Sequence, residues 1–194
     1  MGIQITDIAN YMPIDNSKKF CLDTNVLYWY TYPRYTLLSN KGTEIRGQGY
    51  YDFVDKLVAN GNPLITTRYN ISELINIIEK HEYDIFCAEH SDLPYSKKDF
   101  RRNSKQRQQL KQTLKITMSN VNSICTIADF NFTESTLNDC IETLDKHRCD
   151  VFDFAILSYF KSNNLVNIIT DDSDFSSVDG IHLFTANPSS IISQ

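Results

Sequence analysis

The chain has 194 residues, of which 41% are hydrophobic and 12% aromatic, a composition typical of one folded domain. It contains no apolar run of about 18 residues, and its N-terminus lacks the basic start and the apolar stretch of a signal peptide, so we expect no membrane span. The five cysteines form no Cys-x-x-Cys pair, which indicates reduced thiols in a cytoplasmic protein.

The net charge of −5 is unevenly distributed along the sequence. The segment from Pro94 to Lys115 contains eight basic residues and one acid, Asp99, and therefore carries a charge of +7. The rest of the chain therefore has a net charge of −12. An acidic body with one basic segment indicates a specific role for that segment.

Short apolar runs alternate with helical spacing along the chain. A buried strand is expected at residues 19–23, followed by a helix through 26–30 with Thr24 and Asn25 as caps. After a polar loop at 39–49, further strands are expected at 63–66, 123–127, 167–170 and 181–185, and helices at 50–59, 67–90, 98–122, 133–147 and 151–162. Residues 1–18 are expected to form an N-terminal arm outside a domain that spans residues 19–194.

Strands that alternate with helices predict βαβ units, a central parallel sheet and helices on both of its faces. The fold class expected is therefore a three-layer α/β/α sandwich. Sheets of this kind place their sites beyond the carboxyl ends of the strands, where the strand order reverses. Two predicted strands end in acids, namely Asp23, and Asp171 with Asp172. If these strands are neighbours, their acids meet in one cleft.

Acidic residues at four places are candidates for this cleft: Asp23; Glu73; Asp150 and Asp153; and Asp171, Asp172 and Asp174. Taken singly, each has a structural explanation, such as a turn, a solvated helix position or a helix cap. Carboxylates gathered in one cleft repel each other, which raises their pKa values unless a cation compensates. A hard divalent ion such as Mg²⁺ or Mn²⁺ is the natural partner of such oxygen ligands. It would lower the pKa of a bound water and polarise a phosphoryl oxygen.

Four short motifs resemble those of PIN-domain nucleases: Leu-Asp23-Thr-Asn25-Val-Leu, Ile-Ser-Glu73-Leu, Asp153-Phe-Ala-Ile-Leu and Thr170-Asp-Asp172-Ser-Asp174-Phe175. The resemblance covers residues 19 to 186 and implies a Mg²⁺- or Mn²⁺-dependent endoribonuclease. It also implies that Asp23, Glu73, Asp153 and Asp172 are catalytic and hold the metal, with Asp174 as a second acidic position. Asn25 would orient the first acid and Thr170 would hold the last strand end. For Asp150, capping a helix and supporting the metal remain equal alternatives.

Many bacterial PIN-domain proteins are the toxin of a VapC-like toxin–antitoxin pair, and many form homodimers. The resemblance therefore implies an RNA substrate, an antitoxin-like inhibitor and a second copy of the chain as partners. This sequence departs from such toxins by its N-terminal arm and by a basic helical insertion at about 94–122. A nuclease that acts on structured DNA, and a catalytically silent module that binds RNA or protein, remain alternatives.

Six residues of the basic insertion are candidates for binding the RNA backbone: Lys97, Lys98, Arg101, Arg102, Lys105 and Arg107. Phosphate contacts of this kind give salt-dependent affinity with little sequence preference. Two other interpretations are a solvated helix face and a docking site for an acidic protein partner.

Overall fold

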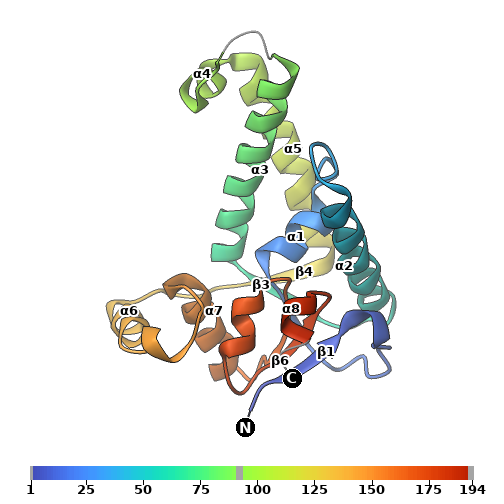
Figure 1. Ribbon diagram of the computed structural model, residues 1–194, viewed down its shortest axis with the longest axis vertical. Helices are drawn as coiled ribbons and strands as arrows, with labels where there is room; N and C mark the ends of the chain where they lie inside the picture. The colour runs from blue at the N-terminus through green and yellow to red at the C-terminus, as the bar shows by residue number, and fades with distance from the viewer. Residues whose placement is uncertain (1, 91–93, 192–194) are drawn as a thin grey trace.

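The computed structural model describes residues 2–90 and 94–191. Its core is one sheet of six parallel strands in the order β1-β6-β5-β2-β3-β4 (Figure 1). The strands are β1 (Gln4–Asp7), β2 (Phe20–Leu22), β3 (Leu64–Thr67), β4 (Cys125–Ala128), β5 (Asn167–Ile169) and β6 (His182–Thr185). The chain builds outward from β2 to β3 and β4, and then returns to the other side of β2 with β5 and β6. The strand order therefore reverses between β2 and β5, which lie side by side.

Helices cover both faces of this sheet, so the predicted α/β/α sandwich is confirmed. The α-helices are α1 (Thr24–Thr31), α2 (Lys41–Ala59), α3 (Arg68–Glu89), α4 (Lys97–Arg102), α5 (Ser104–Ile124), α6 (Glu134–Ile141), α7 (Val151–Ser162) and α8 (Pro188–Ile191). Short 3-10 helices are η1 (Ile8–Asn10), η2 (Leu144–Lys146) and η3 (Ser173–Ser177). Among the described residues, no helix is both long and apolar enough to cross a membrane.

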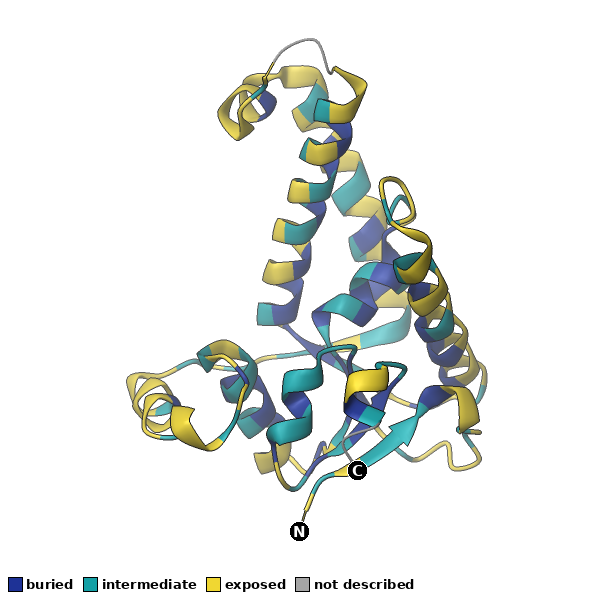
Figure 2. Cartoon of the chain, viewed as in Figure 1, coloured by how far each residue is buried: buried dark blue, intermediate teal, exposed yellow. Residues whose placement is uncertain are grey.

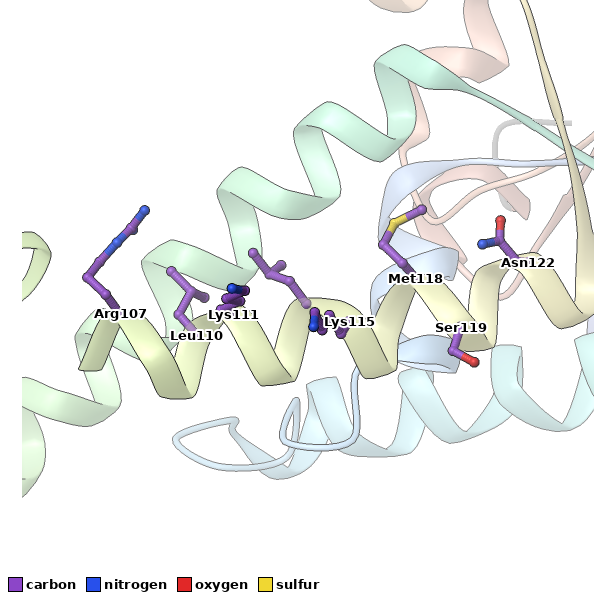
Figure 3. Close-up of a pocket in the computed structure, with 8 residues that line it drawn as sticks. Arg107, Leu110, Lys111, Lys115, Met118, Ser119 and Asn122 are labelled. Carbon is purple, nitrogen blue, oxygen red and sulfur yellow. The ribbon is translucent and has the colours of Figure 1, made fainter. Parts of the chain in front are cut away.

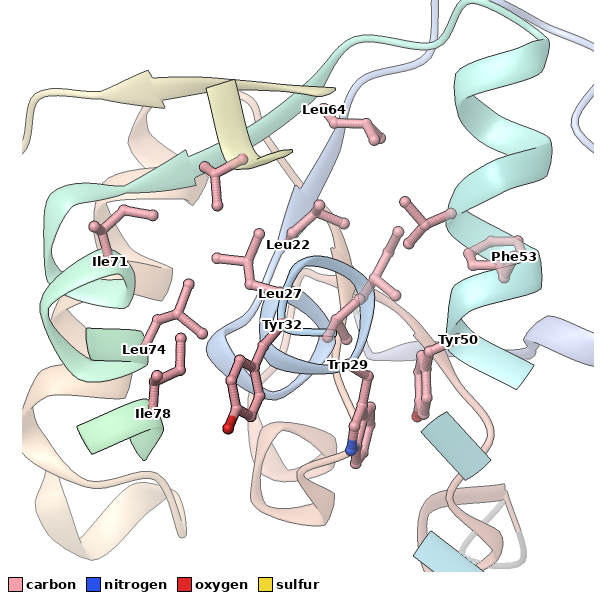
Figure 4. Close-up of a cluster of buried hydrophobic side chains, with 14 of the residues drawn as sticks. Leu22, Leu27, Trp29, Tyr32, Tyr50, Phe53, Leu64, Ile71, Leu74 and Ile78 are labelled. Carbon is pink, nitrogen blue, oxygen red and sulfur yellow. The ribbon is translucent and has the colours of Figure 1, made fainter. Parts of the chain in front are cut away.

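Alternate residues of the central strands point into two separate apolar cores, as the period of two along a strand requires. Ile169 and Phe184 contribute to the larger core, under helices α1, α2, α3 and α5 (Figure 4). Their chain neighbours Ile168 and Leu183 contribute to the smaller core, under α7 and η3. Both faces of the sheet are therefore buried at its centre, which explains why the central strand β2 is a continuous apolar run and not an alternating one (Figure 2).

The second half of α3, α4 and the first half of α5 form a helical extension that projects away from the sheet (Figure 1). One basic helix over 98–122 was predicted; the structure contains two, because Asn103 ends α4 and caps α5. The Asn103 side chain accepts hydrogen bonds from the backbone N–H groups of Lys105 and Gln106. Asparagine side chains compete with helical hydrogen bonds in this way, and so favour a cap over a helix interior. The buried Phe100 anchors the short α4 against Tyr83 of α3.

Two other predicted boundaries were wrong. The segment 39–49, predicted as a loop, contains the first turns of α2, which begins after Asn40 because its side chain caps the Thr43 N–H. The helix predicted at 133–147 ends at Ile141, where the Thr143 hydroxyl donates to two carbonyls of the last turn. Part of the predicted arm is an edge strand, since β1 pairs in parallel with β6.

Candidate active site

Asp23 follows β2 directly and is the N-cap of α1. One carboxylate oxygen, Oδ1, accepts a hydrogen bond from the Thr24 N–H at 2.7 Å. The other, Oδ2, accepts from Asn25 Nδ2 at 2.8 Å and from the Thr170 hydroxyl at 2.5 Å. Burial raises the pKa of Asp23 to about 6, although the Thr170 hydrogen bond opposes that rise. Nearby Glu73 adds to the rise by repulsion.

Thr170 ties the ends of β2 and β5 together. Its fully buried hydroxyl donates to Asp23 and accepts hydrogen bonds from Asn25 Nδ2 at 3.1 Å and from the Asp172 N–H at 3.0 Å. The Asn25 side-chain oxygen in turn accepts from the Asp171 N–H at 3.2 Å. The loop after β5 is therefore held in register with the start of α1, at the point where the strand order reverses.

Glu73 reaches the same place from α3. The Thr24 hydroxyl donates to Glu73 Oε2 at 2.6 Å. Asn70 Nδ2 donates to Thr24 Oγ1 at 3.2 Å and to Asp23 Oδ1 at 3.4 Å. Thr24 and Asn70 were not among the predicted site residues. Asn70 had a detectable signal, because Thr67-x-x-Asn70 has the spacing of the capping box that begins α3.

Asp150 and Asp153 belong to the first turn of α7. Asp150 is the N-cap, and its Oδ1 accepts hydrogen bonds from the N–H groups of Phe152 and Asp153 at 2.8 and 2.9 Å. Asp153 is the residue with the more perturbed charge. Burial, followed by repulsion from Asp23, Asp150 and Glu73, raises the pKa of Asp153 to about 8. Carboxylates from a strand end and from the helices α3 and α7 are therefore close enough to raise the pKa of Asp153.

The three acids after β5 have different surroundings. Asp172 caps η3, with Oδ1 accepting from the Asp174 N–H at 2.8 Å. Asp174 lies 3.8 Å from Arg148. Asp171 forms an ion pair with Arg46 at 3.2 Å and accepts a hydrogen bond from the Tyr50 hydroxyl at 3.1 Å, so its carboxylate has two partners on α2.

A cleft of about 340 Å³ is lined by three of the acids, Glu73, Asp150 and Asp153. Its walls include Ser72, Glu73 and Asn76 from α3, and Asp150, Phe152 and Asp153 from α7. No basic side chain lines this cleft in the part of the chain that the structure describes. Within residues 2–90 and 94–191, no ion pair reaches Asp23, Glu73, Asp153 or Asp172. The cleft therefore carries negative charge that the described side chains do not neutralise.

The basic residues proposed to bind RNA lie on α4 and the start of α5, in the helical extension. Two of them are engaged, because Arg101 and Arg107 both form ion pairs with Glu79 of α3. The other four are exposed and form no ion pair with another described residue: Lys97, Lys98, Arg102 and Lys105. The structure thus separates the basic set from the acids, which lie at the sheet.

A groove of about 810 Å³ follows α5 below this basic set (Figure 3). Its floor is formed by Leu110, Leu114 and Met118, which are spaced four residues apart and so share one helix face. Lys111 and Lys115 line the same groove. This surface combines an apolar stripe with positive charge.

Together, the parallel sheet and the acids at its reversal point define an α/β/α domain with one acidic cleft. The PIN domain family model matches residues 20–181 of the chain, which therefore belongs to this family of nucleases. A solved structure, VapBC2 from Rickettsia felis bound to a DNA fragment from their promoter, is similar in fold. It has 18% sequence identity and a TM-score of 0.50, and the match covers 85% of this chain and 96% of that one. No curated protein matches the sequence.

Proposed function

We propose that this PIN domain is an endoribonuclease that depends on a divalent metal ion, Mg²⁺ or Mn²⁺, and hydrolyses phosphodiester bonds in RNA. The observation that carries the proposal is a group of four carboxylates that form no ion pair with a described residue: Asp23, Glu73, Asp153 and Asp172. Repulsion from Glu73 and Asp172 adds to the raised pKa values of Asp23 and Asp153. A cation that binds between them would remove this repulsion.

The donor set fits a hard divalent ion, because it offers carboxylate oxygens and no thiolate or imidazole. Asp23, Glu73, Asp153 and Asp172 would hold the ion, with Asp174 beside them. In the described part of the chain, no three acidic, His or Cys side chains form a preformed metal cage. Mg²⁺ does not require one, since it usually keeps several waters and binds one or two carboxylates together with substrate phosphate. Once bound, such an ion supplies a more acidic water and neutralises charge on the phosphoryl oxygens.

The side chains around the acids have separate tasks in this proposal. Asn25 and Thr170 fix the orientation of Asp23, and Thr24 fixes that of Glu73. Asp153 has a pKa of about 8, so its carboxyl can hold or release a proton near neutral pH. This pKa belongs to the metal-free cleft, and an ion held by Asp153 would favour the ionised carboxylate and release the proton. The chain thus provides oriented acceptors and one carboxyl that would lose its proton when the ion binds.

Cleavage of single-stranded RNA in Mg²⁺ or Mn²⁺ tests the proposal. The double variant Asp23→Asn, Asp172→Asn should lose cleavage, whereas the matched variant Asp179→Asn, at an exposed acid outside the cleft, should retain it. Unchanged cleavage by the double variant would disprove the catalytic role of these acids. Parallel digestion of single-stranded and flap DNA tests the alternative of a DNA nuclease. Titration calorimetry with Mn²⁺ tests the silent module, because a module without a metal site would give no binding at millimolar ion.

We also propose that the exposed basic residues of the extension attract the RNA backbone. Neutralising Lys97, Lys98 and Arg102 to Gln leaves the Glu79 ion pairs intact. Each lost phosphate contact should reduce the slope of log binding constant against log salt by about 0.7 for a single strand. An unchanged slope would remove these residues from the RNA path.

The α5 groove supports a second element of the proposal, a toxin-like role with an inhibitory protein partner. Its apolar floor and its two lysines complement an acidic amphipathic segment, as an antitoxin-like protein would supply. The product of the gene beside this one is the protein to test by co-purification. Leu114→Asp should abolish the complex, while Ile116→Asp, at an exposed position on another face of the same helix, should not. Equal loss or equal retention in both variants would contradict the groove as the docking site.

A further inference from the structure

An aromatic ring lies exposed in the acidic cleft. Phe152 is 54% exposed and lines the cleft beside Asp153, its neighbour in the chain. One face of its ring stacks on Phe132 at a centroid distance of 5.2 Å and an interplanar angle of 29°. The ring is otherwise partly exposed, and it lines the cleft together with Tyr69. Single exposed aromatics are common on protein surfaces, so the position of this one is the relevant observation.

The ring is held in place by aromatic residues from other parts of the chain. Tyr69, at the start of α3, lies 6.2 Å from Phe152 and 5.4 Å from Phe130. Phe130 also contacts Tyr159 of α7 at 5.0 Å. Phe130 and Phe132 come from the segment between β4 and α6. A ring that contacts aromatic residues of two other segments, Tyr69 of α3 and Phe132, keeps its orientation when a ligand packs on it, so little rotamer entropy is lost on binding.

The polar side chains of the cleft restrict the chemistry of its ligand. Ser72 and Asn76 lie on the α3 wall, four residues apart, and neither forms a side-chain hydrogen bond with another described residue. Both can donate and accept hydrogen bonds. The wall contains carboxylates but no basic group in the described residues, so a ligand cannot be held here by ion pairs with lysine or arginine. A suitable ligand is therefore flat, so that it can stack on the ring of Phe152. It has an edge that forms hydrogen bonds with Ser72 and Asn76, and it carries no negative charge where it contacts the cleft wall.

We propose that this cleft is a subsite for one unpaired nucleobase of the substrate, stacked on Phe152 with its edge toward Ser72 and Asn76. The inference rests on the proposed nuclease function and narrows its substrate to single-stranded RNA. A base inside a duplex is stacked on both sides and cannot offer a free face, whereas bases of single strands are regularly bound on aromatic side chains. Stacking would place the adjoining phosphate beside Asp153 without requiring a basic residue in the cleft.

Fluorescence of 2-aminopurine within a short single-stranded oligoribonucleotide tests the subsite in EDTA, where cleavage does not interfere. Stacking on Phe152 should quench the fluorescence, and Phe152→Ala should remove the quenching and weaken binding by roughly 5- to 150-fold. Phe152→Trp should restore both, because it retains an aromatic face, while Phe152→Leu should not. Tyr51→Ala, at an exposed tyrosine on α2, should change neither signal. The duplex of the same sequence should show no dependence on Phe152.

The outcomes separate this inference from the proposed function. If the parent cleaves RNA and Phe152→Ala binds and quenches like the parent, the subsite is wrong and the nuclease stands. If quenching depends on Phe152 but the parent protein does not cleave RNA in Mg²⁺ or Mn²⁺, the subsite stands and the nuclease proposal fails. If Phe152→Leu binds as tightly as Phe152→Trp, the contact is apolar and not a stacking platform, which also overturns the inference.

Discussion

Replacing Asp153 by Asn removes the carboxylate with the least favourable charge in the cleft. Its pKa of about 8, against an ordinary 3.8, means that the folded chain holds a proton there which the unfolded chain releases. A shift of about 4 units corresponds to an upper limit of about 6 kcal/mol for the ionised form. Because the cleft is open and water screens the charge, we expect Asn to stabilise the metal-free protein by about 2 kcal/mol above pH 8.

The sign of the pH dependence follows from the direction of this shift. Between about pH 4 and pH 8 the folded state binds more protons at Asp153 than the unfolded state does, so the parent loses stability as the pH rises. The variant has no such group. The difference between the two should therefore vanish near pH 4 and reach its full size near pH 8.

Urea unfolding in EDTA across this pH range measures the difference. For a chain of this length, about 2 kcal/mol corresponds to a gain of about 4–8 °C in melting temperature at alkaline pH. A difference that does not change with pH, or a variant less stable than the parent at about pH 9, would refute the electrostatic argument. Adding Mn²⁺ at one hundred times its Kd should reverse the order, since the ion stabilises only the binding-competent parent, by about 2.7 kcal/mol.

Three further predictions concern the scaffold of the site. Thr170→Val should destabilise the fold by about 1–3 kcal/mol, because a buried hydroxyl with three hydrogen-bond partners is lost. It should also raise the pKa of Asp23 further, because the Thr170 hydroxyl no longer donates to that carboxylate. Chemical unfolding should show a smaller loss for Thr66→Val, which removes one bond to a carbonyl. Gly47→Ala places a Cβ 3.0–3.1 Å from the rings of Tyr35 and Trp29 and should destabilise by about 1–3 kcal/mol. Gly49→Ala adds a Cβ with no atom within 4 Å and should stabilise the fold by up to about 1 kcal/mol, because alanine favours a helix more than glycine does. Unfolding of both glycine variants can be followed by the fluorescence of the single tryptophan. Glu79→Gln removes the ion pairs with Arg101 and Arg107 and should speed amide hydrogen exchange in α4 and the start of α5. The global free energy of unfolding should fall by less than about 1 kcal/mol. Exchange rates equal to those of the parent would show that these ion pairs do not stabilise the extension.

The parallel sheet and the layers could be predicted because they depend on simple patterns, whereas the order of the strands was not predicted. Continuous apolar runs such as residues 167–169 indicate strands buried on both faces, and their alternation with helices predicts a parallel sheet. Asp23 and Asp172 follow neighbouring strands, so their position at one edge of the sheet follows from topology alone. The class of the fold therefore required no knowledge of side-chain contacts.

Boundaries were missed where one side chain overrides the local pattern. Residues 41–49 have few apolar side chains, yet they are helical because Asn40 caps them and Gly47 allows close packing on Trp29. Asn103 divides the basic helix by the same kind of local hydrogen bond. The caps are local and were overlooked because the prediction followed apolar spacing, whereas the packing of Gly47 on Trp29 depends on residues that are distant in the sequence.

The residues that orient the acids were only partly predictable. Asn25 was expected beside Asp23 from the family resemblance, whereas the contributions of Thr24 and Asn70 depend on how α3 crosses the start of α1. The exposed ring of Phe152 was also missed, since an aromatic residue in an apolar helix predicts core packing. Its exposure and its place on the cleft wall come from the structure alone.

The two most perturbed carboxylates differ in how they are held, and this difference indicates separate roles. Asp23 accepts hydrogen bonds from Thr24, Asn25 and Thr170, which hold it in one orientation and limit the rise of its pKa. The Asp153 carboxylate accepts no hydrogen bond from another described residue, and its pKa is the higher one. A fixed, more readily ionised acid is suited to anchor a cation. A less restrained, protonated acid can change its charge and orientation when cation and substrate arrive, so we expect Asp153 to be the group whose protonation couples ion binding to pH.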